Sequence, residues 1–488
     1  MCLQLRIENQ EFKRSMVNPQ KITNNQISDI TNLIAQVLQI PEYMVTDQLS
    51  YRSIMQWDSL AHINLMLALE TTYGVTIEPD TIVTLSSVAQ IKAYMQGTLQ
   101  PTSTHTAGIE TQTDGGVVYR GLAGVTFDQS QITLIDGKQG RLQYRGYSIH
   151  DLVEQTTFEE TAFLLLNGQL PTTTELDQFK HQLVAAREIP ATILELIQLL
   201  KDGHPTEVLR TCLSALATFD AERLDGSVTA TKARSIRLIA QMPCLIAAHH
   251  AIRQGKTPIQ PNPTLDHAAN FLYMLQGTIP SQQAQQIVNQ ILILHADHSA
   301  NASTFAARVV AGTRSDWYAA LTAAIAAFAG PLHGGAIEQV IAMIQAIGTP
   351  ERAADYVANL QANNQPVMGF GHRVYQTEDP RARHLRKAAQ ALSAQSDNNY
   401  YAILEAVVQA MRPYMAKGID VNVDFYASVI YHLLGIPYDL FVPAFIVGRT
   451  VGWLAQIQEQ YANNILIRPL LAYVGPIDQP YPALSQRQ

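Results

Sequence analysis

The sequence contains little of what several classes of protein require. Only three of its 488 residues are cysteines, at positions 2, 212 and 244, and they form no C-x-x-C pair. This excludes a disulfide framework or a cysteine zinc site and fits a reducing cytoplasm. Charged residues make up only 15%, with no basic block, which argues against a nucleic-acid partner. We expect no membrane partner, because the most apolar stretches (320–330 and 441–448) are shorter than the roughly 18 residues that span a bilayer.

Size and composition instead indicate a large globular protein of several domains. A chain of 488 residues is long enough for two to four domains with a substantial core. Hydrophobic residues reach 47%, so there are few charges to cover the surface. We therefore expect extensive area to be buried between domains or subunits, and an oligomer.

The chain divides at a segment that is unable to build a core. Residues 98–116 are rich in Thr, Gly, Ser and Gln and have almost no bulky apolar side chains, which predicts a linker. After an N-terminal extension (1–19), residues 20–97 show helical spacing of apolar residues, as at Ile30, Ile34 and Leu38, and carry a net charge of −4. They are predicted to form a small acidic helical bundle, with Ser28 as a candidate cap of its first helix.

The remaining region, 117–488, is predicted to be mostly α-helical. Alternating residues over 132–147 turn on Gly137 and Gly140 and predict a β-hairpin. From Ile149 onward helical periodicity dominates, and prolines at 171, 190, 205, 331 and 350 interrupt it. The fold class is therefore mostly α, without an evident repeat that would indicate a solenoid.

The first candidate site is Ser59, in the segment QWDSL at the start of an amphipathic stretch. A serine there is commonly a helix cap. Yet the acidic bundle, the D-S-L triplet and the downstream ALETTYGV resemble acyl carrier proteins. The resemblance implies that Ser59 carries 4'-phosphopantetheine, attached by a phosphopantetheinyl transferase and charged by an acyl-loading enzyme. His62 and Asn64 replace acidic residues that are frequent in this helix, which changes the partners that we expect to dock.

The second candidate site is a set of histidines and an aspartate. His333 and His372 lie beside glycines, where the backbone can approach a ligand closely. Asp424 stands between apolar residues, so burial could raise its basicity toward that of a general base. His295 and His298 are spaced as zinc ligands on a helix, but no Cys or Glu nearby completes the set, and we expect no metal. No phosphate-binding P-loop sequence is present.

These motifs together resemble the citrate synthase family. The sequences PLHGGA, GFGHRVY-x-x-x-DPRA, NVDFY and RPLLAYVGP occur in the family's order, and 140–171 matches its N-terminal signature. The resemblance covers about 117–488. It implies a nearly all-helical homodimer, with a small domain at about 331–440 inserted in a large one and the active site in the cleft between them.

The resemblance also assigns roles to individual residues. Asp424 would take a proton from the acyl thioester, His333 would donate to the thioester oxygen, and His372 would polarise the ketone of oxaloacetate. Buried cations would bind the substrate carboxylates, because charge-assisted hydrogen bonds are stronger than neutral ones. The remaining assignments are His298, Arg381 and Arg449 as substrate ligands, Arg468 as a substrate ligand from the partner subunit, and Lys417 as a coenzyme A contact.

Departures from the family pattern suggest an unusual thioester donor. Gln376 stands where the family has a cation that contacts the phosphates of coenzyme A, and its loss should weaken binding of that polyanion. Ile337, Ser299, Val421 and Ser428 also replace usual residues.

We therefore hypothesise an acyltransferase that condenses an acyl group carried on Ser59 with oxaloacetate or a related 2-oxo acid. The alternatives are an ordinary citrate or 2-methylcitrate synthase that uses free acyl-CoA, with the bundle as a docking or regulatory module, and a catalytically silent scaffold.

Overall fold

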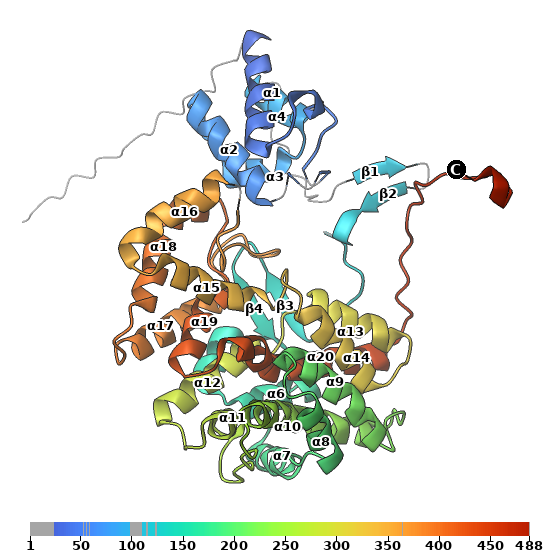
Figure 1. Ribbon diagram of the computed structural model, residues 1–488, viewed down its shortest axis with the longest axis vertical. Coiled ribbons are helices and arrows are strands. Elements are labelled where there is room, and N and C mark those ends of the chain that lie inside the picture. Colours follow the sequence, from blue (N-terminus) through green and yellow to red (C-terminus); the bar gives the residue numbers. More distant parts are fainter. Residues whose placement is uncertain are drawn as a thin grey trace, which may run out of the picture. The chain divides into compact units, whose positions relative to one another are not determined.

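The computed structural model of this chain describes residues 24–51, 53–54, 56–57, 59–97, 110–113, 116–122, 124–363 and 365–487. The chain divides into two compact units, Met1–Val125 and Thr126–Gln488 (Figure 1). Both are mainly helical, as the spacing of apolar residues predicts, and each has its own buried core.

The first unit contains the predicted helical bundle. Its helices are α1 (Asn24–Leu38), a 3-10 turn (Glu42–Met44), α2 (Ser59–Tyr73), α3 (Pro79–Thr84) and α4 (Val88–Met95). Ile30, Ile34 and Leu38 are almost completely buried, which confirms the amphipathic reading of α1. The prediction that Ser28 caps this helix is wrong, because α1 begins four residues earlier and Ser28 lies inside it.

A short hairpin follows in the first unit. Strand β1 (Glu110–Thr113) pairs antiparallel with β2 (Gly116–Tyr119). Five residues of the segment predicted as a linker, 110–113 and Gly116, are therefore strand. Thr111 and Thr113 are β-branched, which favours strands. Residues 98–109 of that segment lie outside the described residues.

The second unit begins with a small antiparallel sheet, which confirms the predicted hairpin. Its strands are β3 (Thr133–Asp136), β4 (Arg141–Tyr144) and β5 (Tyr147–Ser148), in the order β3-β4-β5. The turn after β3 approaches a distant segment closely. A Cβ atom on Gly137 would lie 2.0 Å from the carbonyl oxygen of Val374, and the amide of Gln376 donates to the Gly137 carbonyl at 3.0 Å. Only glycine fits there, and the turn thereby supports the 374–376 segment.

The helices of the second unit form two groups. The larger consists of α5 (Ile149–Gln155), α6 (Phe158–Asn167), α7 (Thr173–Ala185), α8 (Ala191–Leu199), α9 (Pro205–Leu216), α10 (Val228–Arg253), α11 (His267–Gln276), α12 (Gln282–His295), α13 (Ala302–Gly312), α14 (Trp317–Phe328) and α20 (Phe441–Ala462). The other consists of α15 (Ala336–Ile347), α16 (Ala353–Ala362), α17 (Ala382–Ser393), α18 (Tyr400–Met415) and α19 (Val423–Leu433), which pack mainly against one another. This second group occupies the stretch for which a small domain is expected.

Local signals explain where several of these helices begin. Thr157 and Thr172 each form a capping box at the start of α6 and α7, with Glu160 and Glu175 as their partners. Pro205 occupies the first turn of α9, where its missing amide hydrogen costs nothing.

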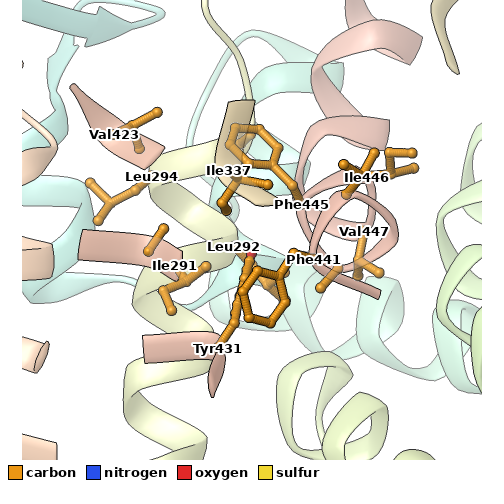
Figure 2. Packing of buried hydrophobic residues seen from close by; sticks show 14 of the residues in the cluster. Ile291, Leu292, Leu294, Ile337, Val423, Tyr431, Phe441, Phe445, Ile446 and Val447 are labelled. Atoms are coloured by element: carbon orange, nitrogen blue, oxygen red, sulfur yellow. The ribbon is translucent and has the colours of Figure 1, made fainter. Parts of the chain in front are cut away.

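Helix α20 is the centre of the second unit. It packs against α6, α10, α12, α13, α14 and α15, and its residues are buried on all sides. Figure 2 shows Phe445 and Ile446 of this helix among Leu292 of α12, Ile337 of α15 and Val423 of α19. Ile337, which departs from the family pattern, is thus part of this core.

One segment among the described residues, Tyr438–Ala462, is long and apolar enough to cross a membrane by length and composition. Its most apolar window is entirely buried inside the protein, as in the core helix of a globular fold.

Replacing Leu292 by Ala should destabilise the second unit. Leu292 is 1% exposed, and truncation of a buried leucine leaves a cavity that costs about 2–5 kcal/mol. Denaturant unfolding followed by tryptophan fluorescence measures the loss. Leu199→Ala is the matched control, because Leu199 is 82% exposed and its removal should change stability by less than about 0.5 kcal/mol. Equal effects of the two substitutions would contradict the assigned core.

Candidate active site

His333 lies in the loop between α14 and α15, held at the edge of the Phe328 ring. Gly334 permits this approach, because a Cβ atom there would lie 2.3 Å from that ring. The backbone amide of Ser303 donates to Nε2 of His333 at 3.3 Å, and the Ser303 hydroxyl lies 2.9 Å from the same nitrogen. Burial, reinforced by Arg449, lowers the pKa of His333 to about 4. The ring is therefore neutral near pH 7, with its proton on Nδ1, from which it can donate to a ligand.

His372 is fixed by its own loop. Its Nδ1 accepts hydrogen bonds from the backbone amides of Val374 (3.0 Å) and Tyr375 (3.1 Å). Burial lowers its pKa to about 4, so the ring is neutral and carries its proton on Nε2. His372 thus offers a hydrogen-bond donor without a positive charge, as a group that polarises a carbonyl should.

Asp424 lies in the first turn of α19, next to the cap residue Asn422. The Asn422 side chain accepts from the Asp424 amide at 3.0 Å and donates to the carbonyl of Gly371 at 3.1 Å. A β-bridge between Phe370 and Val421 joins the same two segments. Asp424 and His372 are therefore placed by one connected piece of backbone.

The surroundings of Asp424 raise its pKa toward neutrality. Burial raises its pKa to about 7, although Arg381 and Arg449 oppose the shift. A carboxylate with this pKa is ionised often enough to accept a proton and basic enough to hold it.

Two buried arginines complete the group. Arg381 donates from Nε and Nη2 to the two oxygens of Asp379 at 2.9 and 2.7 Å. Although burial alone would raise it, the pKa of Asp379 is lowered by this arginine. Arg449 donates from Nε to the carbonyl of His295 at 2.6 Å, and its guanidinium lies over the Phe445 ring. Within the described part of the chain no carboxylate forms an ion pair with Arg449.

His298 belongs to the same group, whereas His295 does not. The His298 ring lies 5.0 Å from that of His372, and its Nε2 lies 3.2 Å from the hydroxyl of Tyr375. His295 instead stacks on Phe445 at 3.6 Å within the core. The pair does not face one ion, and no cluster of three metal-ligating side chains occurs among the residues that the structure describes.

The other predicted site residues are each placed by an element of their own. Arg468 is exposed in the extended segment after α20, which leaves the helical body in Figure 1. Lys417 is half-buried in the turn after α18, and Gln376 is exposed. Ser59 is the first residue of α2.

The structure corrects the reading of His62. It was expected on the docking face of the carrier helix, but it is buried inside the first unit. Its Nδ1 accepts from the indole of Trp57 at 3.1 Å, and Nε2 lies 3.0 Å from the carbonyl of Ile82. His62 therefore does not reduce the acidity of the surface of α2, and it ties the segment before Ser59 to α3.

Several functional residues were missed from the sequence. Ser303 holds His333 and also accepts from the indole of Trp453 at 3.2 Å. Asp379 and Tyr375 stand within the quoted motif GFGHRVYQTEDPRA, so the motif itself carried the signal. Ser303 lies in the first turn of α13, five residues after His298, and this nearness in sequence was the only hint in that region.

Comparison with known proteins agrees with this geometry. The profile of the citrate synthase C-terminal domain matches residues 121–470. The chain belongs to the citrate synthase family. Its second unit carries that family's fold, and the profile of the phosphopantetheine attachment site matches residues 28–95 of the first unit.

The matches to individual relatives extend over nearly the whole length of those relatives. The citrate synthase of Synechocystis is 42% identical over 77% of this chain and 95% of its own. The 2-methylcitrate synthase 2 of Corynebacterium glutamicum is 41% identical over 73% and 95%. A ternary complex of Thermoplasma acidophilum citrate synthase with carboxymethyl coenzyme A and oxaloacetate has a TM-score of 0.73, with 30% identity over 75% of this chain and 99% of its own.

The pKa of Asp424 can be tested through stability. Because the folded-state pKa lies above the unfolded value, the protonated carboxyl stabilises the fold at low pH, and this stability is lost as pH rises to about 7. Relative to Asp424→Asn, the wild type should lose up to about 1.4 kcal/mol per pH unit between about pH 4 and 7, and nothing further above that.

Denaturant titrations of both proteins across this pH range measure the difference. Asp355→Asn is the control, since Asp355 is exposed on α16, and its curve should run parallel to the wild type. A constant difference between wild type and Asp424→Asn at all pH values would contradict the raised pKa.

Proposed function

We propose that this protein condenses an acyl thioester, carried by 4'-phosphopantetheine on Ser59, with oxaloacetate or a related 2-oxo acid. The product is citrate or a citrate-like tricarboxylate. The observation that carries the proposal is the presence of both parts on one chain: a phosphopantetheine attachment domain and the citrate synthase group of Asp424, His333 and His372.

The chemistry follows from the protonation states. Asp424 removes a proton from the carbon next to the thioester, and Nδ1–H of His333 stabilises the developing enolate oxygen. The Nε2–H of His372 polarises the ketone. A carbon–carbon bond then forms, and the ketone oxygen takes a proton. Hydrolysis next breaks the carbon–sulfur bond, with water supplying the hydroxyl of the new carboxylate and the thiol leaving with a proton.

The arginines account for the second substrate. Arg449 has a buried guanidinium without an ion pair among the described residues, and Arg381 keeps Nη1 beyond the two nitrogens that bind Asp379. Both suit carboxylates of a 2-oxo dicarboxylic acid, with His298 beside them. We place Arg468 of a second subunit in this site, in a homodimer, since its exposed segment leaves its own helical body.

The tether explains the changed coenzyme A region. If the thioester arrives on Ser59, no nucleotide phosphates need a cation at position 376, where Gln376 is exposed. A covalently linked carrier supplies its cargo at an effective concentration of about millimolar. The chain would then need a phosphopantetheinyl transferase and an enzyme that loads the acyl group.

The second candidate is condensation of free acyl-CoA, with the first unit as a docking or regulatory module. Two observations favour it: Lys417 is retained, and the Thermoplasma relative was crystallised with a coenzyme A thioester analogue. The relatives include synthases of citrate and of 2-methylcitrate, so the donor would be acetyl-CoA or propanoyl-CoA.

Modification of Ser59 should be visible by intact mass. Incubation with coenzyme A and a broad-specificity phosphopantetheinyl transferase should add one phosphopantetheine to the wild type and none to Ser59→Ala. Ser53→Ala is the matched control, because this exposed serine lies in the same loop and should leave the increment unchanged.

Kinetics then separate the two candidates. An acyl group loaded on Ser59 should be consumed when oxaloacetate is added, and Asp424→Asn should slow this step by about 10²–10⁴-fold. If the loaded group persists while free acyl-CoA reacts equally fast with wild type and Ser59→Ala, the tethered mechanism is wrong and the second candidate holds.

A further inference from the structure

Asp297 is a buried carboxylate to which the proposed chemistry gives no role. It is 0% exposed and directly precedes His298 in the turn after α12. Its Oδ2 accepts three hydrogen bonds, from the Thr133 hydroxyl (2.5 Å), the Ser299 amide (3.0 Å) and the Gln456 side chain (3.1 Å). Its Oδ1 has no hydrogen-bond partner. A buried carboxylate with one unsatisfied oxygen is costly to keep ionised, so its ionised form needs a compensating charge.

The compensating charge is Arg449, on the adjacent face of α20. A Cβ atom on Gly452 would lie 2.0 Å from the Ala296 carbonyl oxygen and 2.7 Å from Oδ1 of Asp297. Arg449, one turn earlier on the same helix, donates to the carbonyl of His295. The turn that holds Asp297 is therefore pressed against α20 beside Arg449.

The charges around the two arginines differ. Arg381 is neutralised directly by Asp379, through two hydrogen bonds. Burial lowers the pKa of Arg449 to about 10, and Asp297 gives the strongest opposing effect. Burial also raises the pKa of Asp297, with Arg449 the main opposing charge. Asp297 is thus the principal negative charge that compensates Arg449 when the site is empty.

We propose that Asp297 is the counter-charge of Arg449 in the empty site and takes up one proton when a dicarboxylate binds there. This inference rests on the proposed function, in which a substrate carboxylate binds Arg449. The incoming carboxylate compensates the guanidinium in place of Asp297. Left ionised, Asp297 would be a buried anion beside a second anion, and a proton from solvent removes that cost.

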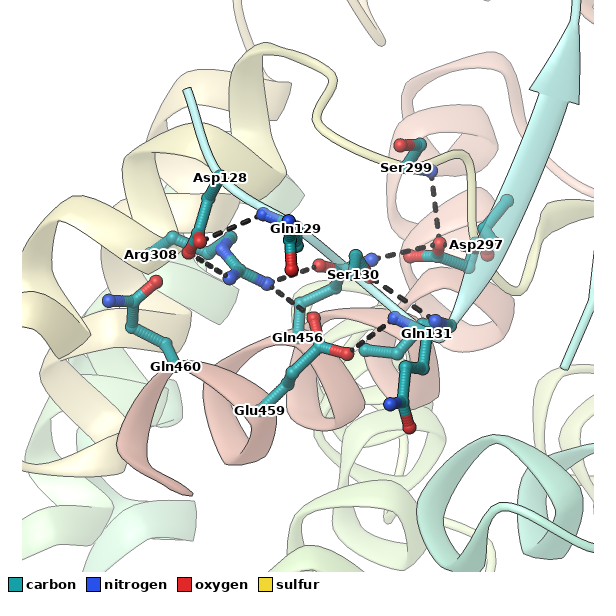
Figure 3. Close-up of polar contacts among 12 residues, drawn as sticks. Asp128, Gln129, Ser130, Gln131, Asp297, Ser299, Arg308, Gln456, Glu459 and Gln460 are labelled. Atoms are coloured by element: carbon teal, nitrogen blue, oxygen red, sulfur yellow. Dashed lines mark hydrogen bonds and ion pairs between the residues drawn. The ribbon is translucent and has the colours of Figure 1, made fainter. Parts of the chain in front are cut away.

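The other groups that face Asp297 leave it as the proton acceptor on its side of the site. Thr133 and Gln456 are neutral donors, and the Tyr144 hydroxyl of β4 donates to its backbone carbonyl at 2.9 Å. His295 and His298, on its own segment, have pKa values held well below the usual range by burial. Beyond Gln456, Arg308 is already paired with Glu459 and Asp128 (Figure 3). Burial lowers the pKa of Arg145, a further cation, and Asp297 is among the charges that oppose this shift. Among the described residues, Asp424, His333 and His372 are the competing acceptors.

Isothermal titration with oxaloacetate tests the proposal. Titrations of the full chain in buffers of different ionisation enthalpy count the protons taken up on binding. The wild type should take up close to one proton per site, and the dissociation constant should rise by up to about tenfold per pH unit where this uptake occurs. Asp297→Asn should abolish the uptake and flatten the pH dependence, because asparagine is neutral and similar in shape.

Three further variants separate the possible sources of the proton. Asp424→Asn should retain the uptake, which excludes the competing carboxylate. Asp128→Asn, at the far end of the network in Figure 3, should also retain it and controls for general loosening. Thr133→Val removes one hydrogen bond from the ionised form at nearly constant volume, so the pH of maximal uptake should move upward. This variant keeps the test available if Asp297→Asn does not fold.

The outcomes are distinguishable. Uptake that persists in Asp297→Asn, or that is absent in a wild type that binds oxaloacetate, overturns the role of Asp297 and leaves the proposed function intact. Absence of oxaloacetate binding in the wild type counts against the proposed function itself.

Discussion

The catalytic unit depends on a positive charge held inside an apolar helix. Arg449 lies in α20, whose other sides are buried in the core, and no described carboxylate bonds to it directly. Removing a guanidinium from water costs free energy, and the neighbours of Arg449 offset part of that cost. A backbone carbonyl, the face of Phe445 and the nearby charge of Asp297 stabilise it. Because no described carboxylate pairs directly with Arg449, its guanidinium can still attract an incoming anion.

The same burial sets the protonation states of the reacting groups. Removal from water disfavours charge on every side chain, so the histidines become neutral donors and the aspartate becomes a stronger base. Hydrogen bonds then decide which nitrogen holds the proton. For His333 this is decided by the Ser303 amide, and for His372 by the amides that follow it in its own loop. Burial is thus the largest cause of the pKa shifts of both histidines and of the aspartate, and the nearby arginines act in addition.

The sequence was sufficient for the fold class, the hairpin and the two family resemblances, because each is encoded by local spacing or by a contiguous run of residues. It was insufficient where tertiary contacts decide. The reading of His62 failed because helical spacing shows which residues share a face, but not that Trp57 folds back to meet that face. Asp297 was passed over because nothing local reveals that this carboxylate is buried near an arginine of a distant helix. Asp379, in contrast, stands two residues from the arginine that it binds, within a motif that carried the signal.

The β-bridge between Phe370 and Val421 has a consequence for motion. It joins the loop of His372 to the start of α19, so the base and the group that polarises the ketone travel together. His333 and Arg449 are instead held by the larger group of helices. Ser303 of α13 contacts both His333 and Trp453 of α20. Arg449 of α20 donates to the carbonyl of His295 at the end of α12. A shift between these two parts would therefore change the distances between the pair Asp424 and His372 and the pair His333 and Arg449, while the contacts within each part stayed the same.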